Sequence, residues 1–390
     1  MGKHRQSPEE QWGPDRPVPP PPRPAPALYV PEPQEPLEPL EPLGQGGGQE
    51  PGPGEVYDWQ REDWSETGAP APSAHRTPGA LVQASGHAAG GEASPGDRWR
   101  PLVVGTPGPL FAPRPPTGGL SYRPDTVCDG WSTDALDLRL ASVRGHQHRY
   151  DGRPREDDAA AGWDPATGAV VFAVADGVSD ARQPHIGSQL ACRSAVDELL
   201  AQVRAGAGRA TDWRKLLSTV HWQLLEQARR LLRAPDTGVE ATADLLATTL
   251  VAGVATPGPG GVRVELVWVG DSGVWAIKHG ELYPLAGGKR TGADGLLSSA
   301  VRPLPYLPAE IRPFAFELDP GTVLLIGTDG FGDPVGDGRG AVARLFADAL
   351  VGPVPPLGFA HLLDFSRETF DDDRTLLALW PRSEVRECRG

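Results

Sequence analysis

The sequence is poor in cysteine and contains no long apolar run. Its three cysteines, Cys128, Cys192 and Cys388, are scattered and odd in number, which argues against a disulfide framework and fits a reducing compartment. No run of about 18 apolar residues is present, so we expect no membrane-spanning helix. The first residues, MGKHRQSPEEQW, lack the apolar core of a signal peptide. These absences predict a soluble, cytoplasmic protein.

Positive charge is also scarce. The 390 residues carry 37 Lys and Arg against 51 Asp and Glu, a formal net charge of -14. No basic stripe offsets this excess, which argues against nucleic acid as the main partner. Proline, by contrast, is abundant, and 27 of the 44 prolines precede residue 125. Hydrophobic periodicity begins only after that point.

This change in composition predicts two parts. We expect residues 1–121 to form a proline-rich, largely disordered tail and residues 122–390 to form a folded domain. Two stretches of the tail, VYDWQREDW at 56–64 and RWRPLVVGTPGPLFAP at 98–113, are too apolar for a pure linker. They could lie on the folded domain.

The tail contains two proline motifs. PVPPPPRPAP at 17–26 favours polyproline II, and EPLEPLEPL at 35–43 repeats every three residues. Such a repeat would place its leucines on one face of a polyproline II helix. The tail could therefore dock on a proline-motif partner, or it could be a semi-rigid spacer, which is the simpler interpretation.

The folded part reads as strands interrupted by paired helices. Apolar runs and alternation predict strands at 138–144, 169–175, 248–255, 263–270, 274–280, 314–318, 322–328 and 375–380. Helical spacing predicts helices at 185–204, 211–233, 340–350 and 359–370. Because the helices come in pairs and do not alternate singly with strands, a doubly wound parallel sheet is disfavoured. Stacked antiparallel sheets with helices outside fit better.

Carboxylates stand at the ends of several of these strands. Asp176-Gly177 and Asp329-Gly330 directly terminate apolar strands, and Asp271 follows VELVWVG. Asp372 and Asp373 stand immediately before TLLALW, and the pair Asp157 and Asp158 precedes the strand that leads to Asp176. Four other Asp-Gly pairs, at 129, 151, 294 and 337, have polar surroundings and are interpreted as turns.

Strands that share a sheet bring their ends close together, so these carboxylates would repel one another. Two unit charges 4 Å apart cost about 4 kcal/mol at an effective dielectric near 20. Either some of the carboxyls stay protonated or a cation lies among them. Oxygen-only ligands without paired His or Cys indicate Mg²⁺ or Mn²⁺ in preference to zinc. The remaining alternative is a set of unrelated strand-end turns.

The order of these motifs resembles that of the PP2C-type metal-dependent protein phosphatases, in their bacterial serine/threonine-specific branch. The resemblance spans about residues 135–380. It rests on RPREDDA at 153–159, VFAVADGV at 171–178, ATTLVAGV at 247–254, WVGDSGVW at 268–275, GTDGFGD at 327–333 and DDRTLLAL at 372–379. It implies an α+β fold, a four-layer αββα sandwich of two antiparallel sheets flanked by helix pairs.

The resemblance also implies a site with two or three Mn²⁺ or Mg²⁺ ions. Asp176 would bridge two ions, with the Gly177 carbonyl on one of them. Asp329 and Asp372 would complete the shell of the other, and Asp158 would hold metal-bound water. The remaining implied roles are a third, weaker metal position for Asp271 and a phosphate-binding role for Arg153.

The implied chemistry is hydrolysis of phosphoserine and phosphothreonine in a phosphorylated protein substrate, by attack of a metal-activated water. Arg153, Asp158 and Asp176 would be the catalytic residues. No nucleophilic cysteine is needed, and we interpret all three cysteines as packing or surface residues. The alternatives are a catalytically weak phosphatase-like scaffold acting through its tail, and a hydrolase of another phosphoester.

Two departures from the family pattern stand out. Val178 occupies the position where eukaryotic members place a proton-donating His, and nearby His185 is interpreted as a surface residue. The other histidines, His148 among them, receive the same interpretation. The mobile flap that helps family members to choose substrates is reduced here to KRTGADGLLSSAVRPLP at 289–305. The shortened flap leaves substrate choice open.

Overall fold

The computed structural model describes the part of the chain that carries the hydrophobic periodicity. It describes residues 101–109, 111, 113–114, 124–206, 210–288, 290–291, 297–298 and 302–382. The chain divides into two units, 1–54 and 55–390, and every described residue belongs to the second. The predictions for the tail before residue 101, including both proline motifs, lie outside the described residues.

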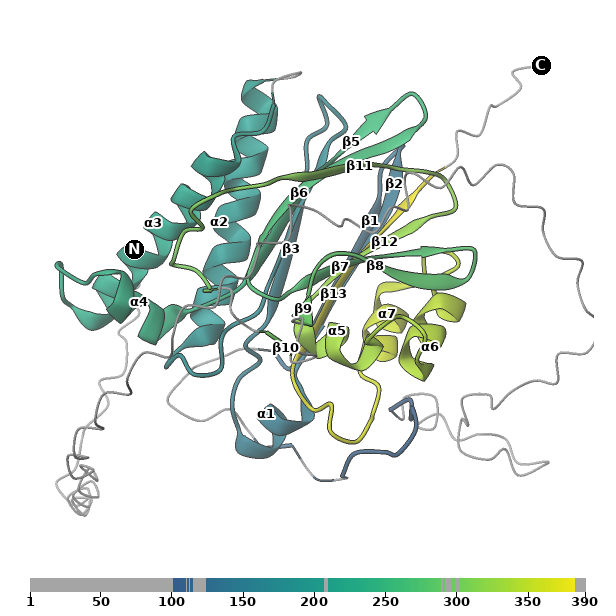
Figure 1. Ribbon diagram of the computed structural model, residues 1–390, viewed down its shortest axis with the longest axis horizontal. Coiled ribbons are helices and arrows are strands. Elements are labelled where there is room, and N and C mark those ends of the chain that lie inside the picture. The colour runs from purple at the N-terminus through teal and green to yellow at the C-terminus, as the bar shows by residue number, and fades with distance from the viewer. Residues whose placement is uncertain are drawn as a thin grey trace, which may run out of the picture. The chain divides into compact units, whose positions relative to one another are not determined.

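Two antiparallel sheets form the centre of the described domain (Figure 1). The six-stranded sheet has the order β1 (Thr126–Ser132), β2 (Leu136–Val143), β13 (Arg374–Pro381), β12 (Val323–Gly327), β7 (Gly273–Lys278) and β8 (Glu281–Gly287). The five-stranded sheet has the order β11 (Phe314–Leu318), β6 (Gly261–Val269), β5 (Leu250–Gly258), β4 (Val170–Ala175) and β3 (Asp158–Trp163). A separate pair joins β9 (Arg290–Thr291) to β10 (Leu297–Ser298).

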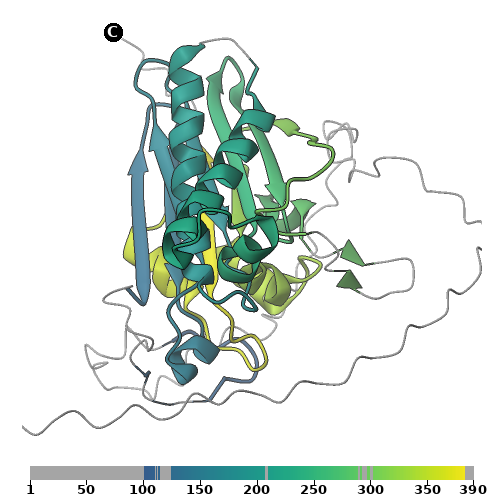
Figure 2. The same ribbon diagram turned by 90° about the vertical axis from the view of Figure 1, so that its left-hand side faces the viewer.

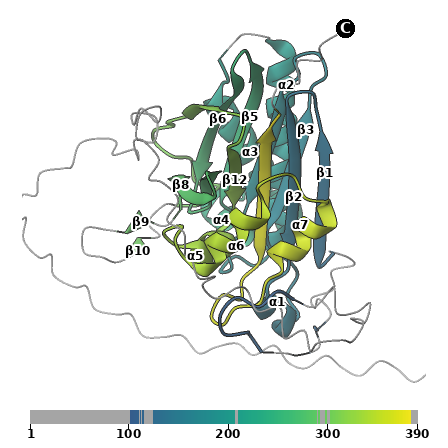
Figure 3. The same ribbon diagram turned by 90° about the vertical axis from the view of Figure 1, so that its right-hand side faces the viewer.

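Helices cover the outer face of each sheet. The five-stranded sheet carries α2 (Pro184–Ala205), α3 (Trp213–Leu232) and α4 (Val239–Leu246), as Figure 2 shows. The six-stranded sheet carries α5 (Asp329–Val335), α6 (Ala341–Ala349) and α7 (Pro356–Leu363), as Figure 3 shows. The short helix α1 (His146–Asp151) lies at one end of the sandwich. The predicted fold class, an α+β αββα sandwich, is confirmed for the described residues.

Strand alternation separates the buried side chains into three clusters. Val170 and Phe172 of β4 face the other sheet, whereas Val171 and Ala173 face α2 and α3. A third cluster lies between the six-stranded sheet and α5 to α7. Every residue of β4 is buried, which explains why its sequence is a continuous apolar run without alternating polar residues. Burial of one large side chain such as Phe172 contributes about 1.5–3 kcal/mol.

The turn predicted at Asp129-Gly130 is wrong, because both residues lie inside β1. Asp129 pairs with Leu140, and Gly130 pairs with Arg139 on β2. A side chain at position 130 would collide with that of Arg139, so glycine here serves close approach and does not mark a turn. Strand β3 and helices α1 and α4 were not predicted either.

The helix predicted at 359–370 is also partly wrong, since α7 begins earlier and ends at Leu363. Beyond it, Ser366 forms a parallel bridge with Val103. The Val104 N–H donates to the Ser366 carbonyl at 3.0 Å, and the Val104 side chain is buried. The 101–109 part of the second apolar stretch therefore packs on the folded domain.

The cysteines and the lengths of the helices can also be compared with the predictions. Cys192 is buried in the core beneath α2 and Cys128 is half-buried, so both are packing residues as predicted, while Cys388 lies outside the described residues. Within the residues that the structure describes, no helix is both long enough and apolar enough to cross a bilayer.

Candidate functional site

Acidic side chains lie at one end of the sandwich, where β4 and β12 end and where β3 and β13 begin. Asp176 follows β4, Asp329 opens α5 directly after β12, and Asp372 precedes β13. The registers of the two sheets bring these strand ends to the same end of the molecule. Residues separated by about 200 positions in the sequence therefore become neighbours.

The carboxyls of this cluster are in direct contact. The Asp176 carboxyl forms hydrogen bonds with those of Asp157 and Asp329. Burial, followed by the charges of Asp157, Asp329 and Asp372, raises the pKa of Asp176 well above its ordinary value. Burial and the charges of Asp373 and Asp372 raise the pKa of Asp157 in the same direction. The structure thus brings Asp176, Asp329 and Asp372 together, as predicted from the strand ends.

Asp372 forms the outer rim of the cluster. Its pKa is raised to about 6 by burial and by the charges of Asp373 and Asp329. Asp372 is nevertheless an exposed residue, so water reaches its carboxylate.

The fourth member of the cluster is Asp157, which the sequence analysis passed over in favour of Asp158. The β3–β4 register pairs Asp158 with Ala175, a residue of the core beneath α2. Asp157 is therefore placed opposite Asp176, and its Oδ2 accepts a hydrogen bond from Thr328 Oγ1 at 2.7 Å. The Asp158 carboxylate lies 3.7 Å from the Arg155 guanidinium. The signal that distinguishes the two is the strand register, which the sequence does not contain.

Neighbouring strands fix the backbone of Asp176. Its N–H donates to Thr249 Oγ1 at 2.9 Å, and its carbonyl accepts from Thr249 N–H at 2.7 Å and from Thr248 Oγ1 at 2.8 Å. Gly177 pairs with Thr248 in an antiparallel bridge. A Cβ at Gly177 would lie within 2.8 Å of the Glu156 carbonyl and of Pro184, so only glycine fits here.

Asp271 follows β6 at the same end of the sandwich, where the chain crosses to β7 in the other sheet. It is not among the main charges that raise the pKa of Asp157, Asp176 or Asp372. Its role at a third metal position stays a prediction.

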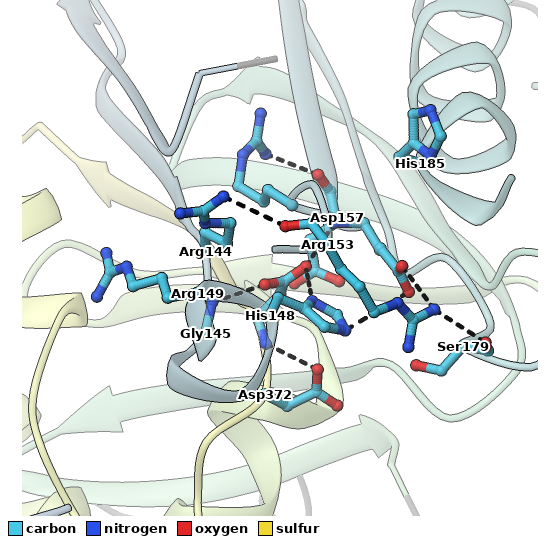
Figure 4. A network of polar contacts seen from close by, with 12 residues as sticks. Arg144, Gly145, His148, Arg149, Arg153, Asp157, Ser179, His185 and Asp372 are labelled. Atoms are coloured by element: carbon cyan, nitrogen blue, oxygen red, sulfur yellow. Dashed lines mark hydrogen bonds and ion pairs between the residues drawn. The ribbon is translucent and has the colours of Figure 1, made fainter. Parts of the chain in front are cut away.

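Arg153 lies in the same polar network as Asp157 and Asp372 (Figure 4). Its Nη2 is 2.8 Å from Glu156 Oε1 and donates to the Ser179 carbonyl at 3.1 Å. The Arg153 side chain remains 37% exposed, so the held guanidinium still reaches solvent. This arrangement suits an arginine that binds a phosphate entering from solution.

Asp373 connects three segments around the cluster. Its Oδ1 accepts from the Gly145 N–H at 2.6 Å, and its Oδ2 accepts from the Glu156 N–H. The same Oδ2 forms an ion pair with His148 Nδ1 at 2.9 Å. Burial alone would raise the pKa of Asp373, but these partners outweigh it and hold the pKa below its ordinary value.

The two histidines near the site are buried, contrary to the surface positions expected for them. Burial alone would lower the pKa of His148, but Asp373, Glu156 and Asp372 raise it to about 9. His148 therefore carries a positive charge beneath the acidic cluster. His185 lies in the first turn of α2, as Figure 4 shows.

The donor set suits a hard divalent cation. Four carboxyls provide oxygen ligands only, and the raised pKa values of Asp157, Asp176 and Asp372 reflect burial and negative charge that the surrounding protein does not fully compensate. Among the described residues, however, no three acidic, His or Cys side chains are already arranged around one point as ligands. By its chemistry this oxygen-only donor set fits Mg²⁺ or Mn²⁺.

Solved structures of bacterial phosphatases share a weak likeness with this chain. PppA, described as a key regulatory component of T6SS in Pseudomonas aeruginosa, is 17% identical, covers 65% of this chain and 100% of its own, and has a TM-score of 0.41. The catalytic domain of the serine/threonine phosphatase PstP, described as a complex with two manganese ions, is 18% identical, covers 64% and 99%, and has a TM-score of 0.41. No curated protein matches the sequence.

The family is shown by sequence. The family model for protein phosphatase 2C matches residues 144–352, which include the acidic positions 157, 176 and 329 and end before Asp372. This match covers more than half of the chain. The chain therefore belongs to the protein phosphatase 2C family of serine/threonine phosphatases.

Proposed function

We propose that the acidic cluster is the centre of a Mn²⁺- or Mg²⁺-dependent phosphatase that hydrolyses phosphoserine and phosphothreonine in protein substrates. One observation carries this proposal: Asp157, Asp176, Asp329 and Asp372 come from strand ends of two different sheets and lie side by side, and burial together with the neighbouring carboxylates raises the pKa of Asp157, Asp176 and Asp372. A fold does not tolerate such repulsion without a compensating role, and cation binding supplies one.

The residues have separate tasks. Asp176, the Gly177 carbonyl, Asp329 and Asp372 would hold the ions. Asp157 is better placed than Asp158 for the remaining acidic position, because the β3–β4 register puts it opposite Asp176. Bound divalent cations supply Lewis-acid charge that polarises a phosphoryl group and lowers the pKa of water.

Arg153 would bind the substrate phosphate. Glu156 and the Ser179 carbonyl hold its Nη2, which orients the planar group and leaves its other nitrogens for phosphoryl oxygens. The charge of the arginine offsets the negative charge that the phosphoryl oxygens carry during the reaction.

The test is phosphate release by the purified full-length chain. We expect turnover of a phosphoserine peptide and of p-nitrophenyl phosphate with Mn²⁺, and loss of both on addition of EDTA. Asp176→Asn and Asp329→Asn should each lower kcat/KM by at least about a hundredfold, because each removes a charged ligand without changing side-chain size.

Asp180→Asn is the matched control, since this exposed aspartate lies four residues after Asp176. It should retain full activity, and circular dichroism should show an unchanged fold in all three variants. Full activity of Asp176→Asn would refute the proposed centre. A protein that binds Mn²⁺ but releases no phosphate from either substrate would favour the alternative, a phosphatase-like scaffold.

A further inference from the structure

A pocket of about 570 Å³ opens beside the candidate centre, between α3, the end of β6 and the segment that leads to β11. Trp268, Val269, Pro305, Tyr306, Leu307 and Pro308 provide most of its apolar wall. Leu307 is 43% exposed at its mouth. An exposed, largely apolar recess of this size is typical of a ligand-binding or peptide-binding surface.

The pocket wall is rigidly tied to the domain. Leu304 is fully buried, and its backbone exchanges two hydrogen bonds with Thr248, at 3.1 and 2.9 Å. His221 Nδ1 on α3 lies 2.6 Å from the Pro305 carbonyl. The Tyr306 N–H donates to the Pro303 carbonyl at 3.1 Å, which closes the chain into a turn. The pocket is therefore preformed.

The backbone next to the pocket is also paired, through Thr248, with the backbone of the candidate centre. Thr248 bridges Leu304 on one side and Gly177 on the other, so three backbone segments lie side by side. Directly paired residues of antiparallel segments are about 5 Å apart, which places Leu304 about 10 Å from Gly177. An extended peptide advances about 3.3 Å per residue, so three residues span this distance.

Charge favours a negatively charged occupant. Arg302 stands at the pocket with its Cζ 5.1 Å from the centre of the Tyr306 ring, and none of the lining residues that the structure describes is acidic. An arginine stacked on an aromatic ring keeps its outer donors for a carboxylate or phosphate. A phosphopeptide meets both conditions, because it carries negative charge and can place an apolar side chain in the recess.

We propose that this pocket is a specificity subsite, which binds an apolar side chain about three residues from the phosphorylated residue of a protein substrate. The proposal rests on the proposed phosphatase function and names the class of substrate that the centre prefers. Trp268, Tyr306 and Leu307 contact the apolar side chain, and Arg302 attracts the acidic peptide. The segment after the shortened flap thereby selects substrates.

The test uses phosphoserine peptides of glycine and alanine that carry one leucine, moved from the first to the fifth position on either side. With the full-length protein and Mn²⁺, we expect kcat/KM to be highest with leucine about three residues away, and roughly tenfold higher than for the leucine-free peptide. Tyr306→Ala should remove this gain, and so should Leu307→Ser, which alters only the exposed mouth.

Three comparisons separate this subsite from the phosphatase centre. p-Nitrophenyl phosphate has no peptide, so both variants should hydrolyse it at the rate of the unmodified protein. Trp163→Ala is the matched control, because this exposed tryptophan lies at the far end of β3 from the centre. All variants should hydrolyse the leucine-free peptide equally. The substitution in the pocket and the removal of leucine from the peptide disrupt the same contact, so their effects should not add.

A second readout does not depend on turnover. In EDTA, fluorescence anisotropy of a dye-labelled phosphopeptide should show tighter binding with the leucine than without it, and Tyr306→Ala should abolish the difference. If no leucine position improves either kcat/KM or binding, or if both variants keep the preference, the subsite is refuted. If peptides bind with the leucine preference but no substrate is turned over, the proposed phosphatase function fails and the subsite stands.

Discussion

Removing the Asp373 carboxylate should destabilise the domain, because this side chain joins the start of β13 to α1 and to the loop that carries Arg153. In Asp373→Ala, the N–H groups of Gly145 and Glu156 lose their acceptor in a buried position. Each unpaired donor costs about 1–3 kcal/mol, so the free energy of unfolding should fall by roughly 2–6 kcal/mol for the two donors. Weaker repulsion of Asp157 and Asp372 offsets part of it.

Asp373→Asn should have a smaller effect of the same sign. The carboxamide has one acceptor oxygen, whereas its NH₂ group can only donate. In either orientation the NH₂ group faces one of the two backbone N–H groups, so one of these contacts is lost. We expect a loss of about 1–3 kcal/mol, which a two-oxygen carboxylate avoids.

The assay is urea unfolding of the full-length chain followed by far-UV circular dichroism. The midpoint should fall in the order of the unmodified protein, Asp373→Asn and Asp373→Ala, with an unchanged denaturant slope. Asp371→Ala, two residues earlier and exposed, is the control and should leave the midpoint in place. If Asp373→Ala unfolds within about 0.5 kcal/mol of the unmodified protein, the reasoning from buried donors is wrong.

Three further outcomes are expected. In thermal melts, Mn²⁺ at a hundred times its Kd should raise the free energy of unfolding by about 2.7 kcal/mol. Asp176→Asn should lose this gain, and an equal gain in both proteins would place the ion elsewhere. Arg153→Lys should raise KM for a phosphopeptide roughly tenfold, since an ammonium group cannot form two parallel hydrogen bonds; an unchanged KM would remove Arg153 from phosphate binding. Gly330→Ala should cost about 1–3 kcal/mol or more in thermal unfolding, because the new methyl group meets the Asp373 carbonyl, whereas Gly352→Ala points into open space and should cost little.

Local patterns predicted much of the fold. β4 and β12 are buried on both faces, so their sequences are continuous apolar runs that are visible without a structure. The long helices α2 and α3 carry apolar side chains at helical spacing, and their predicted bounds differ from the observed ones by one or two residues. Edge strand β1 was missed because Asp129-Gly130 has the composition of a turn.

Positions determined by long-range contacts were not predicted. The sequence does not show that Ser366 pairs with Val103 and so limits α7. His148 likewise lies in a short polar segment of the sequence that is typical of the protein surface. In the structure it is buried against Asp373, more than 200 residues later, which raises the pKa of His148. In both cases the deciding partner lies in a distant part of the chain.

The sequence by itself determined which strands end in carboxylates. Through the order of its motifs it also indicated a domain of the protein phosphatase 2C type, in which Asp176, Asp329 and Asp372 lie close together. Only the tertiary structure places Asp157, and not Asp158, opposite Asp176, because a shift of one residue in strand register turns a side chain to the opposite face of the sheet. The pocket lined by Trp268 and Tyr306 was also decided there, since its walls come from α3, β6 and the segment before β11, which meet only after folding.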